Sequence, residues 1–278
     1  MTNKETEAIV SSTQAYYDGP ADQIYRTIWG DNLHLGVSCS DECPHPEAME
    51  HTNEIMAQAV HLTLGTRVLD LGCGYGSTAR YLASQYGCHI TATNISQKEL
   101  DLAAQRTAES GLEDLLTFEY GDFHNLKYAD GSFDIVWSQE AFLHGADKVQ
   151  VLLECLRVLA PGGTLVFTDI LVRSGTPQAD RDRIYDRVKS PDMWDLPDYR
   201  RALDGLGFDV TREEDWSQHV ARSYDWVRKE VIQNRSELLA LVDARTIDGT
   251  VDALQFWVEA ATEGKIGWAL FVAQKPQG

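Results

Sequence analysis

The fold of this chain is decided by the stretch Val68-Leu69-Asp70-Leu71-Gly72-Cys73-Gly74-Tyr75-Gly76. A short apolar run ends in an acidic residue, three glycines follow at alternate positions, and Ser77 opens a helical pattern. This order is typical of a buried parallel strand, a tight loop and the start of a helix. The glycines let the backbone approach a bulky ligand, and the helix amides face the bend. A carboxylate at the strand end suits an amino group and would repel phosphates.

Strands and helices alternate from this stretch to residue 172. Four more strand patterns follow, at His89–Asn94, Leu115–Tyr120, Phe133–Trp137 and Thr164–Val172. Helical patterns separate them, among them Asp147–Leu159, which Pro161-Gly162-Gly163 closes. Such alternation predicts a parallel sheet that binds ligands at the carboxyl ends of its strands. The candidate site residues in this part of the chain all fall at those ends.

Helical regions lie on either side of this core. Residues 11–36 are rich in Tyr and Trp, which either pack on the core or close over a bound ligand. Residues 178–206 and 217–262 are mostly helical and charged, and two strand-like pieces, Phe208–Glu213 and Trp268–Ala273, interrupt them. These two pieces predict an antiparallel hairpin that completes a seven-stranded α/β sheet. We expect three parts: an N-terminal arm at 1–64, a ligand-binding core at 65–172, and a helical cap with the final strands at 173–278.

Composition excludes several classes of partner. The 278 residues carry a formal net charge of −19, which disfavours binding to nucleic acid or to an anionic membrane. No apolar run approaches 18 residues, and the polar start is no signal peptide. The cysteines at 39, 43, 73, 88 and 155 are odd in number and scattered, which predicts reduced thiols in a cytoplasmic protein. Cys39-x3-Cys43-Pro-His45 lacks a second ligand pair, so we expect a loop and no metal.

The motif spacing resembles one known family. The loop reads GxGxG, whereas dinucleotide-binding folds carry GxGxxG and an acid at the end of the second strand. Together with Asp122-Phe123 and the run from Glu154 to Gly163, this resembles the class I S-adenosylmethionine (SAM) dependent methyltransferases over residues 65–172. The resemblance implies their Rossmann-like sheet and SAM as cofactor. A NAD-binding fold is the weaker alternative, and a strand-loop-helix without a ligand is another.

The resemblance implies a set of cofactor-binding residues. Asp70 and the loop at Gly72 and Gly74 would hold the amino acid end of SAM, and Asp122 with Phe123 would hold the adenine, although Asp122 could instead cap a turn. The family usually ends its second strand in an acid that holds the ribose, but this chain has Asn94. Glu99 could supply the missing carboxylate or serve as the capping-box partner of Ser96. The set expected to bind the cofactor is completed by Trp29, Ile95 and Ser138.

Within the class, the chain resembles sarcosine/dimethylglycine N-methyltransferases, which make glycine betaine. The resemblance depends on Tyr16-Tyr17, Ile28-Trp29-Gly30-x-x-Leu33-His34-Leu-Gly36, Asn94-Ile95-Ser96, Trp137-Ser138-Gln139, Phe142-Leu143-His144 and Phe167-Thr168-Asp169. It continues in the cap through Tyr199-Arg200, Arg222-x-Tyr224 and Trp268. Several of these residues also occur in related sugar O-methyltransferases of natural-product pathways.

The chemistry of the acceptor separates these two groups. An amine with a free lone pair needs no base during transfer; it needs orientation, exclusion of water, aromatic faces for the cation and a partner for its carboxylate. A hydroxyl acceptor needs its proton removed, and His144, which follows the fourth strand, would be the catalytic base. Each of these side chains could instead be structural or solvated. The residues expected to bind the acceptor are Tyr17, Tyr25, Gln139, Asp169, Arg200, Arg222, Tyr224 and Trp268.

The sequence therefore predicts a SAM-dependent methyltransferase that acts on the nitrogen of a small amine such as sarcosine or dimethylglycine. We expect in-line transfer without a metal, with S-adenosylhomocysteine as the second product. An O-methyltransferase that uses His144 is one alternative. A SAM-binding protein that transfers nothing, or a cyclase of the same fold, is another. We expect a small-molecule acceptor, a cytoplasmic monomer or homodimer, and no binding to nucleic acid or membrane.

Overall fold

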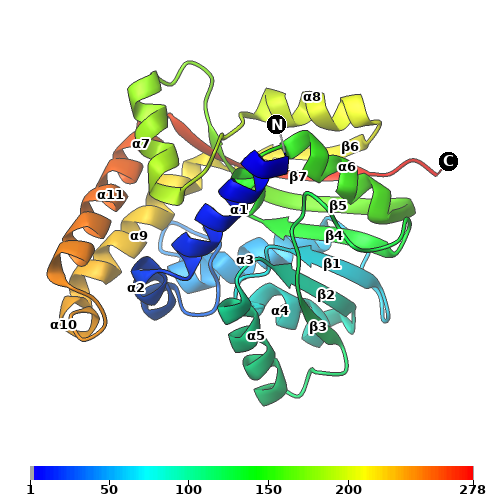
Figure 1. Ribbon diagram of the computed structural model, residues 1–278, viewed down its shortest axis with the longest axis horizontal. Coiled ribbons are helices and arrows are strands. Elements are labelled where there is room, and N and C mark those ends of the chain that lie inside the picture. The colour runs from blue at the N-terminus through cyan, green and yellow to red at the C-terminus, as the bar shows by residue number, and fades with distance from the viewer. Residues whose placement is uncertain (1–2, 278) are drawn as a thin grey trace.

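The predicted strands form one sheet in a computed structural model, which describes residues 3–277 (Figure 1). Within those residues the sheet has seven strands in the order β3-β2-β1-β4-β5-β7-β6. The strands are β1 (Arg67–Leu71), β2 (His89–Asn94), β3 (Leu116–Tyr120), β4 (Phe133–Gln139), β5 (Leu159–Val172), β6 (Asp209–Asp215) and β7 (Ile266–Gln274). The first five are parallel, and β7 lies antiparallel between β5 and β6. The predicted fold class is thereby confirmed.

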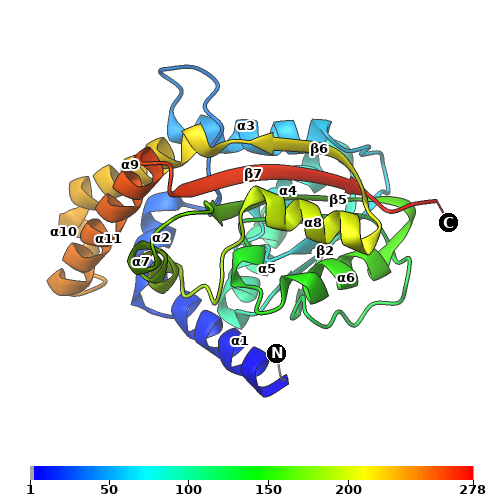
Figure 2. The ribbon, with the colours of Figure 1, turned by 90° about the horizontal axis from the view of Figure 1, so that it is seen from above.

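Helices cover both faces of the sheet and one end of it (Figures 1 and 2). The helices before β4 are α1 (Asn3–Tyr17), α2 (Pro20–Trp29), α3 (His45–Gln58), α4 (Ser77–Tyr86) and α5 (Gln97–Glu109). Those after β4 are α6 (Lys148–Val158), α7 (Gln178–Val188), α8 (Leu196–Leu206), α9 (Val220–Gln233), α10 (Arg235–Leu238) and α11 (Ala244–Thr262). Two short 3-10 turns, Phe142–His144 and Ser217–His219, complete the secondary structure of the described residues.

Alternating side chains of the strands build two separate cores. Val68 of β1 packs in a cluster with residues of α3, α4, α9 and α11, whereas Leu69 and Leu71 pack with α6 and α8. This division follows from the two-residue period of a strand, which directs neighbouring side chains to opposite faces. Both faces of the central strands are therefore buried, and the carboxyl ends of those strands remain for a site.

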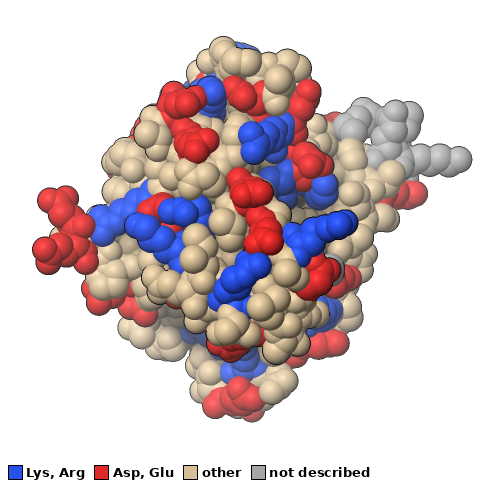
Figure 3. Space-filling model, turned by 90° about the vertical axis from the view of Figure 1, so that its left-hand side faces the viewer, with Lys and Arg blue, Asp and Glu red and all other residues tan. Residues whose placement is uncertain are grey.

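The last helices gather beside one end of the sheet. Figure 1 shows α7, α9, α10 and α11 together on the left, and α2 contacts both α9 and α11. Figure 3 shows that basic and acidic side chains alternate over this face. Ion pairs such as Arg228 with Asp225 and Arg235 with Asp248 belong to it. The division of the chain into three parts at residues 64 and 172 stays a prediction.

Several strand boundaries differ from the sequence prediction by one or more residues: β3 begins at Leu116, β6 is Asp209–Asp215 and β7 is Ile266–Gln274. β4 continues to Gln139, two residues past Trp137. β5 begins at Leu159, although Pro161-Gly162-Gly163 predicted a break there. The pairing of β4 with β5 shifts register between Phe133 and Ile135, so the proline and glycines lie in an irregular stretch of the strand. Proline and glycine are tolerated at such irregularities because no regular ladder bond is required of them.

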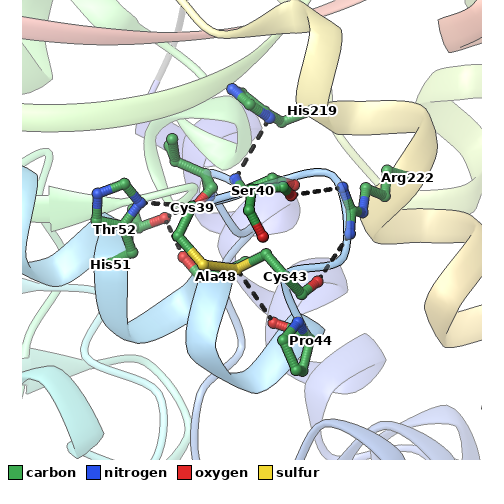
Figure 4. The surroundings of a disulfide bond; sticks show 11 residues. Cys39, Ser40, Cys43, Pro44, Ala48, His51, Thr52, His219 and Arg222 are labelled. Carbon is green, nitrogen blue, oxygen red and sulfur yellow. Dashed lines mark hydrogen bonds between the residues drawn. A yellow bond between two sulfur atoms is a disulfide. The ribbon is translucent and has the colours of Figure 1, made fainter.

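The expectation of reduced cysteines is wrong for Cys39 and Cys43, which form a disulfide across a separation of four residues (Figure 4). The spacing of the cysteines in the sequence did not reveal this pair, because the turn between Cys39 and Cys43 brings the two sulfur atoms together. Cys73, Cys88 and Cys155 are free thiols. In the part of the chain that the structure describes, no helix is long and apolar enough to cross a membrane.

Candidate active site

A deep cavity lies over the carboxyl ends of β1, β2 and β4. The first glycine loop forms one wall, and α1, α2, α7 and α9 contribute side chains to the opposite side. Most of the residues predicted for the site line this cavity: Tyr17, Tyr25, Trp29, Asp70, Gly72, Gly74, Asn94, Ile95, Glu99, Phe123, Gln139, His144 and Tyr224. Segments far apart in the sequence therefore meet where the parallel strands end, as the fold requires.

At the β1 end of the cavity, Asp70 presents a buried carboxylate. Its Oδ2 atom is buried and has no hydrogen-bond partner among residues 3–277, and burial raises its pKa to about 7. The adjoining loop is held in place, because Gly72 N and Cys73 N both donate to the carbonyl of Thr93. Gly72 has φ +78°, and a Cβ there would lie 2.5 Å from the Cβ of Ala141. A buried, unsatisfied carboxylate beside a glycine cradle fits an amino group of a ligand.

At the end of β2, Asn94 and Glu99 act together. Asn94 Nδ2 donates to Glu99 Oε2 over 2.6 Å, and Asn94 Oδ1 accepts from Ser96 N. Ser96 caps α5 by accepting from Glu99 N, but the reciprocal bond of a capping box goes to Asn94. The Glu99 carboxylate is thus turned to the cavity side of the strand. Asn94 and Glu99 both line the cavity, and their predicted contact with the ribose stays a prediction.

Two of the residues predicted to bind the cofactor do not line the cavity. Asp122 Oδ1 accepts from the backbone and the ring of His124, and these two bonds lower its pKa although burial opposes them. Phe123 and Gly121 beside it do line the cavity. Ser138 is buried and donates to the carbonyl of Leu71, so it joins β4 to β1. Any contact of Asp122 or Ser138 with the cofactor stays a prediction.

His144 faces the arm. Its Nε2 lies 2.7 Å from the hydroxyl of Tyr17, while its Nδ1 is buried without a hydrogen-bond partner. Burial, with a smaller contribution from Lys148, lowers its pKa to about 3. The ring is therefore neutral at pH 7. The bond to Tyr17 attaches the C-terminal end of α1 to the turn that follows β4.

Four tyrosines surround the other end of the cavity: Tyr16, Tyr17, Tyr25 and Tyr224. The guanidinium of Arg187, on α7, lies among them at 5.8 Å from the ring centroid of Tyr25 and 5.0 Å from that of Tyr224. Tyr16 and Arg187 are site residues that sequence reasoning missed. Tyr16 adjoins Tyr17 in the arm and could have been included, but the charged helical pattern of α7 gave no signal for Arg187.

Arg200 and Arg222, both predicted to bind the acceptor, do not line the cavity. Arg200 is on α8 at the surface and pairs with Asp204 and Glu213. Arg222 donates to the carbonyls of Ser40 and Cys43, as Figure 4 shows, and it fastens the disulfide loop to α9. The helical periodicity of the cap could not tell which face of α8 or α9 would point inward.

Asp169 and Trp268 are core residues. Asp169 is fully buried, accepts from Leu143 N and from the Tyr199 hydroxyl, and has its pKa raised to about 7 by burial. Trp268 is also fully buried and donates to Glu140 Oε1 over 2.6 Å. Neither lines the cavity, but each bonds to a residue that does, Asp169 to Leu143 and Trp268 to Glu140. Any contact of Asp169 or Trp268 with the acceptor stays a prediction.

Glu140 is a further cavity residue that sequence reasoning missed. It follows β4 with φ 46°, a left-handed conformation that a glutamate rarely adopts. Its carboxylate accepts from Leu35 N, Thr168 Oγ1 and Trp268 Nε1, and burial raises its pKa to about 7. These bonds attach the segment before α3 to the sheet. Gln139 beside it accepts from Thr78 and donates to Asn53, at the α4 side of the cavity.

Comparison with known proteins places the chain in a family. Residues 69–167 match the model of a methyltransferase domain. The chain is 36% identical to a sarcosine/dimethylglycine N-methyltransferase of Halorhodospira halochloris, with 99% of each chain covered. It is 30% identical to a 27-O-demethylrifamycin SV methyltransferase of Amycolatopsis mediterranei, over 94% of this chain and 95% of the relative.

A solved structure agrees with these relatives. The crystal structure of a protein from Galdieria sulphuraria, provisionally assigned as a sarcosine dimethylglycine methyltransferase, superposes with a TM-score of 0.87. It is 30% identical, and the match covers 93% of this chain and 99% of that one. This chain belongs to the SAM-dependent methyltransferases, in the family that includes the sarcosine/dimethylglycine N-methyltransferases.

Proposed function

We propose that this enzyme methylates the nitrogen of a small amino acid such as sarcosine or dimethylglycine, giving a betaine-type product. The observation that carries the proposal is the cavity end where four tyrosine side chains and one guanidinium surround the space beyond the cofactor loop. Such an end suits a small molecule that carries both a methylated nitrogen and a carboxylate. The full-length similarity to the Halorhodospira enzyme supports the same substrate class.

The residues that line the cofactor end support the binding of SAM there. Asp70 would accept from the amino group, the loop at Gly72 and Gly74 would follow the amino acid tail, and Glu99 with Asn94 would hold the ribose hydroxyls. Phe123 would pack on the adenine. When bound, SAM supplies a methyl group on a positively charged sulfur. The unpartnered Oδ2 of Asp70 is the strongest argument for this fit, because a buried carboxylate without a partner is costly.

The acceptor end contributes binding and exclusion of water. The tyrosine rings offer faces that attract a methylated ammonium, the form in which the product leaves. The Glu140 carboxylate, fixed by three hydrogen bonds, lines the same cavity and in its ionised form would add negative charge near the positively charged sulfur of the cofactor. Orientation and desolvation would supply most of the rate acceleration.

A base is not required for this reaction, and His144 is poorly suited to be one. A general base works best with a pKa near the working pH, but burial holds the pKa of His144 at about 3. Its Nε2 is also engaged by the Tyr17 hydroxyl. Both facts favour an amine acceptor, whose ammonium proton can leave to water before the transfer, over a hydroxyl acceptor, whose proton must be removed during the transfer.

The test is an assay of S-adenosylhomocysteine release by the purified enzyme with glycine, sarcosine, dimethylglycine, sugars and phenols. We expect turnover with sarcosine or dimethylglycine, and mass spectrometry should find the added methyl group on nitrogen. Turnover of a sugar or phenol without any turnover of the amines would replace the proposal with O-methyl transfer. Cofactor binding without turnover of any acceptor would favour a binding protein or a cyclase.

We infer that the enzyme acts in the cytoplasm, as a monomer or a homodimer, and without nucleic acid as a partner. The net charge of −19 supports the last point, because phosphate backbones repel such a surface. Size-exclusion chromatography with light scattering would test the oligomeric state.

A further inference from the structure

Arg187 lies at the acceptor end of the cavity, in the last turn of α7. Its Nη2 donates to the Tyr25 hydroxyl over 3.1 Å, and its guanidinium carbon lies 4.5 Å from the ring centroid of Trp257. With Tyr25 and Tyr224 also against it, the guanidinium is enclosed by aromatic rings on several sides. The side chain therefore has a fixed position and retains its charge inside the protein.

In the part of the chain that the structure describes, no acid forms an ion pair with Arg187. The groups that raise its pKa, against the effect of burial, are the tyrosines Tyr25, Tyr224 and Tyr16. Its Nε is buried and has no hydrogen-bond partner among the described residues. Arg173, by contrast, is paired with two acids, Asp195 and Asp215. Leaving a buried guanidinium donor unsatisfied is costly unless a ligand completes its bonds.

We propose that Arg187 recognises the carboxylate of the methyl acceptor and selects amino acids over amines that lack an acid. This role rests on the proposed function and specifies its substrate class. A guanidinium presents parallel N–H groups that match the two oxygens of a carboxylate, and a fork held by Tyr25 needs little reordering to bind. A carboxylate bound there leaves the nitrogen of a small amino acid within the tyrosine-lined space.

The position of Arg187 also separates it from the cofactor end. Asp70 and Glu99 line the strand end of the same cavity, whereas Arg187 shares its surroundings with the tyrosines of α1, α2 and α9. With Asp70 and Glu99 at the strand end and the Arg187 guanidinium among the tyrosines, the cavity can hold two charged molecules in defined orientations. The ammonium of the cofactor would be drawn to Asp70, and the carboxylate of the acceptor to Arg187.

The test pairs a protein change with a substrate change. Arg187→Gln and the wild type are assayed with dimethylglycine and with N,N-dimethylglycinamide, in which the carboxylate is neutral. A charge-assisted bond of ~1.5–3 kcal/mol predicts a ~10- to 100-fold loss of kcat/KM for dimethylglycine in the variant. The amide should be affected less than ~3-fold, and the non-additivity of the two changes measures their contact. Because each substrate is compared between the variant and the wild type, the different basicity of the two substrate nitrogens cancels.

Arg183→Gln is the matched control. Arg183 is on the same helix one turn earlier, exposed, and 3.8 Å from the ring centroid of Phe256, outside the cavity. It should change neither substrate's kcat/KM. Arg187→Lys, which retains the charge but loses the fork, should recover part of the dimethylglycine activity. Thermal unfolding and S-adenosylhomocysteine binding, measured by calorimetry, show whether each variant is folded.

The outcomes distinguish this role from the proposed function. Equal losses for dimethylglycine and the amide in Arg187→Gln, with the wild type active on dimethylglycine, would overturn the carboxylate contact and leave the N-methylation intact. Weaker binding of S-adenosylhomocysteine in a folded Arg187→Gln would assign the arginine to the cofactor instead. A wild type that methylates neither amine would overturn the proposed function and this role together.

Discussion

At the residue scale, Asp70 is a carboxyl group whose charge depends on what binds beside it. Burial raises its pKa to about 7, so a large fraction is protonated in the free protein at pH 6. An ammonium binds only the ionised form. Below pH 7, binding must therefore release a proton, and the affinity should fall as the pH is lowered, approaching a ~10-fold loss per pH unit.

Calorimetry of S-adenosylhomocysteine binding between pH 5.5 and 8.5 checks this prediction, with proton release read from buffers of different ionisation enthalpy. Asp70→Asn should bind more weakly and with little dependence on pH across that range. Glu140→Gln is the control, because burial also raises the pKa of Glu140 to about 7 but its carboxylate is engaged by three donors. Proton release that persists in Asp70→Asn would assign it to another acid.

His144 allows a second prediction at this scale. Because an amine acceptor needs no base, His144→Gln should lower kcat with dimethylglycine by less than ~10-fold, well short of the ~10²–10⁴-fold that general base catalysis contributes. Tyr17→Phe removes the same hydrogen bond from the other side, so its effect should match that of His144→Gln. The double variant should add little to either change. A His144→Gln enzyme that has lost activity by a thousandfold would instead assign His144 as a base.

Single residues could be predicted where the sequence itself fixes their place on a strand end. Asp70, Asn94 and Phe123 line the cavity because they end or follow parallel strands, and strand ends can be found from apolar runs. Arg187 and Arg200 could not be told apart in this way. Both are arginines on charged helices, and only the packing of α7 and α8 decides which one faces the cavity.

At the element scale, the disulfide between Cys39 and Cys43 is a local feature that the hydrophobic periodicity of the sequence does not reveal. Cys39 and Cys43 close a short loop, which Arg222 attaches to α9 (Figure 4). Cross-linking so few residues removes little entropy from the unfolded chain, ~2 kcal/mol in the loop-closure model. For 278 residues, an unfolding entropy of ~2.1 cal/mol/K per residue converts this to a change in Tm of ~3–4 °C.

We expect a reductant to lower the Tm of the wild type by up to this amount and to leave the Cys39→Ser/Cys43→Ser variant unchanged. Scanning calorimetry with and without dithiothreitol measures both. Methyl transfer at 25 °C should persist in the variant, since neither cysteine lines the cavity. A wild-type Tm that does not respond to reductant, in a sample shown by mass spectrometry to be reduced, would contradict the stabilising role.

Most helices and strands could be predicted from the sequence, because short-range signals such as helix caps mark where they begin. Asp147 caps α6 by accepting from Gln150 N, and Ser96 caps α5, so both helix starts were visible in the sequence. The start of β5 at Leu159 was not visible, because Pro161 and Gly162 argue for a turn on local grounds. Pairing of Leu159 with Phe133 of β4, and backbone hydrogen bonds of Gly162 and Gly163 with Lys275, override that preference.

At the scale of the whole molecule, the net charge of −19 acts on stability as well as on partners. Charges of both signs alternate on the face in Figure 3, but acids outnumber basic residues by 43 to 24 in the whole chain. Surface ion pairs contribute ~0–1 kcal/mol each, and salt weakens them. The repulsion among the excess acids is also screened by salt, and it opposes the compact state.

Since the repulsion involves many more pairs than the exposed ion pairs do, we expect Tm to rise as NaCl is increased from 10 mM to 500 mM at pH 7.5. A variant that neutralises four exposed acids, Asp41→Asn, Glu42→Gln, Glu113→Gln and Asp114→Asn, changes the net charge from −19 to −15. It should have a higher Tm at 10 mM NaCl and a smaller rise with salt, as measured by scanning calorimetry. Equal slopes for the two proteins would show that the salt acts through apolar burial, since that effect does not depend on net charge.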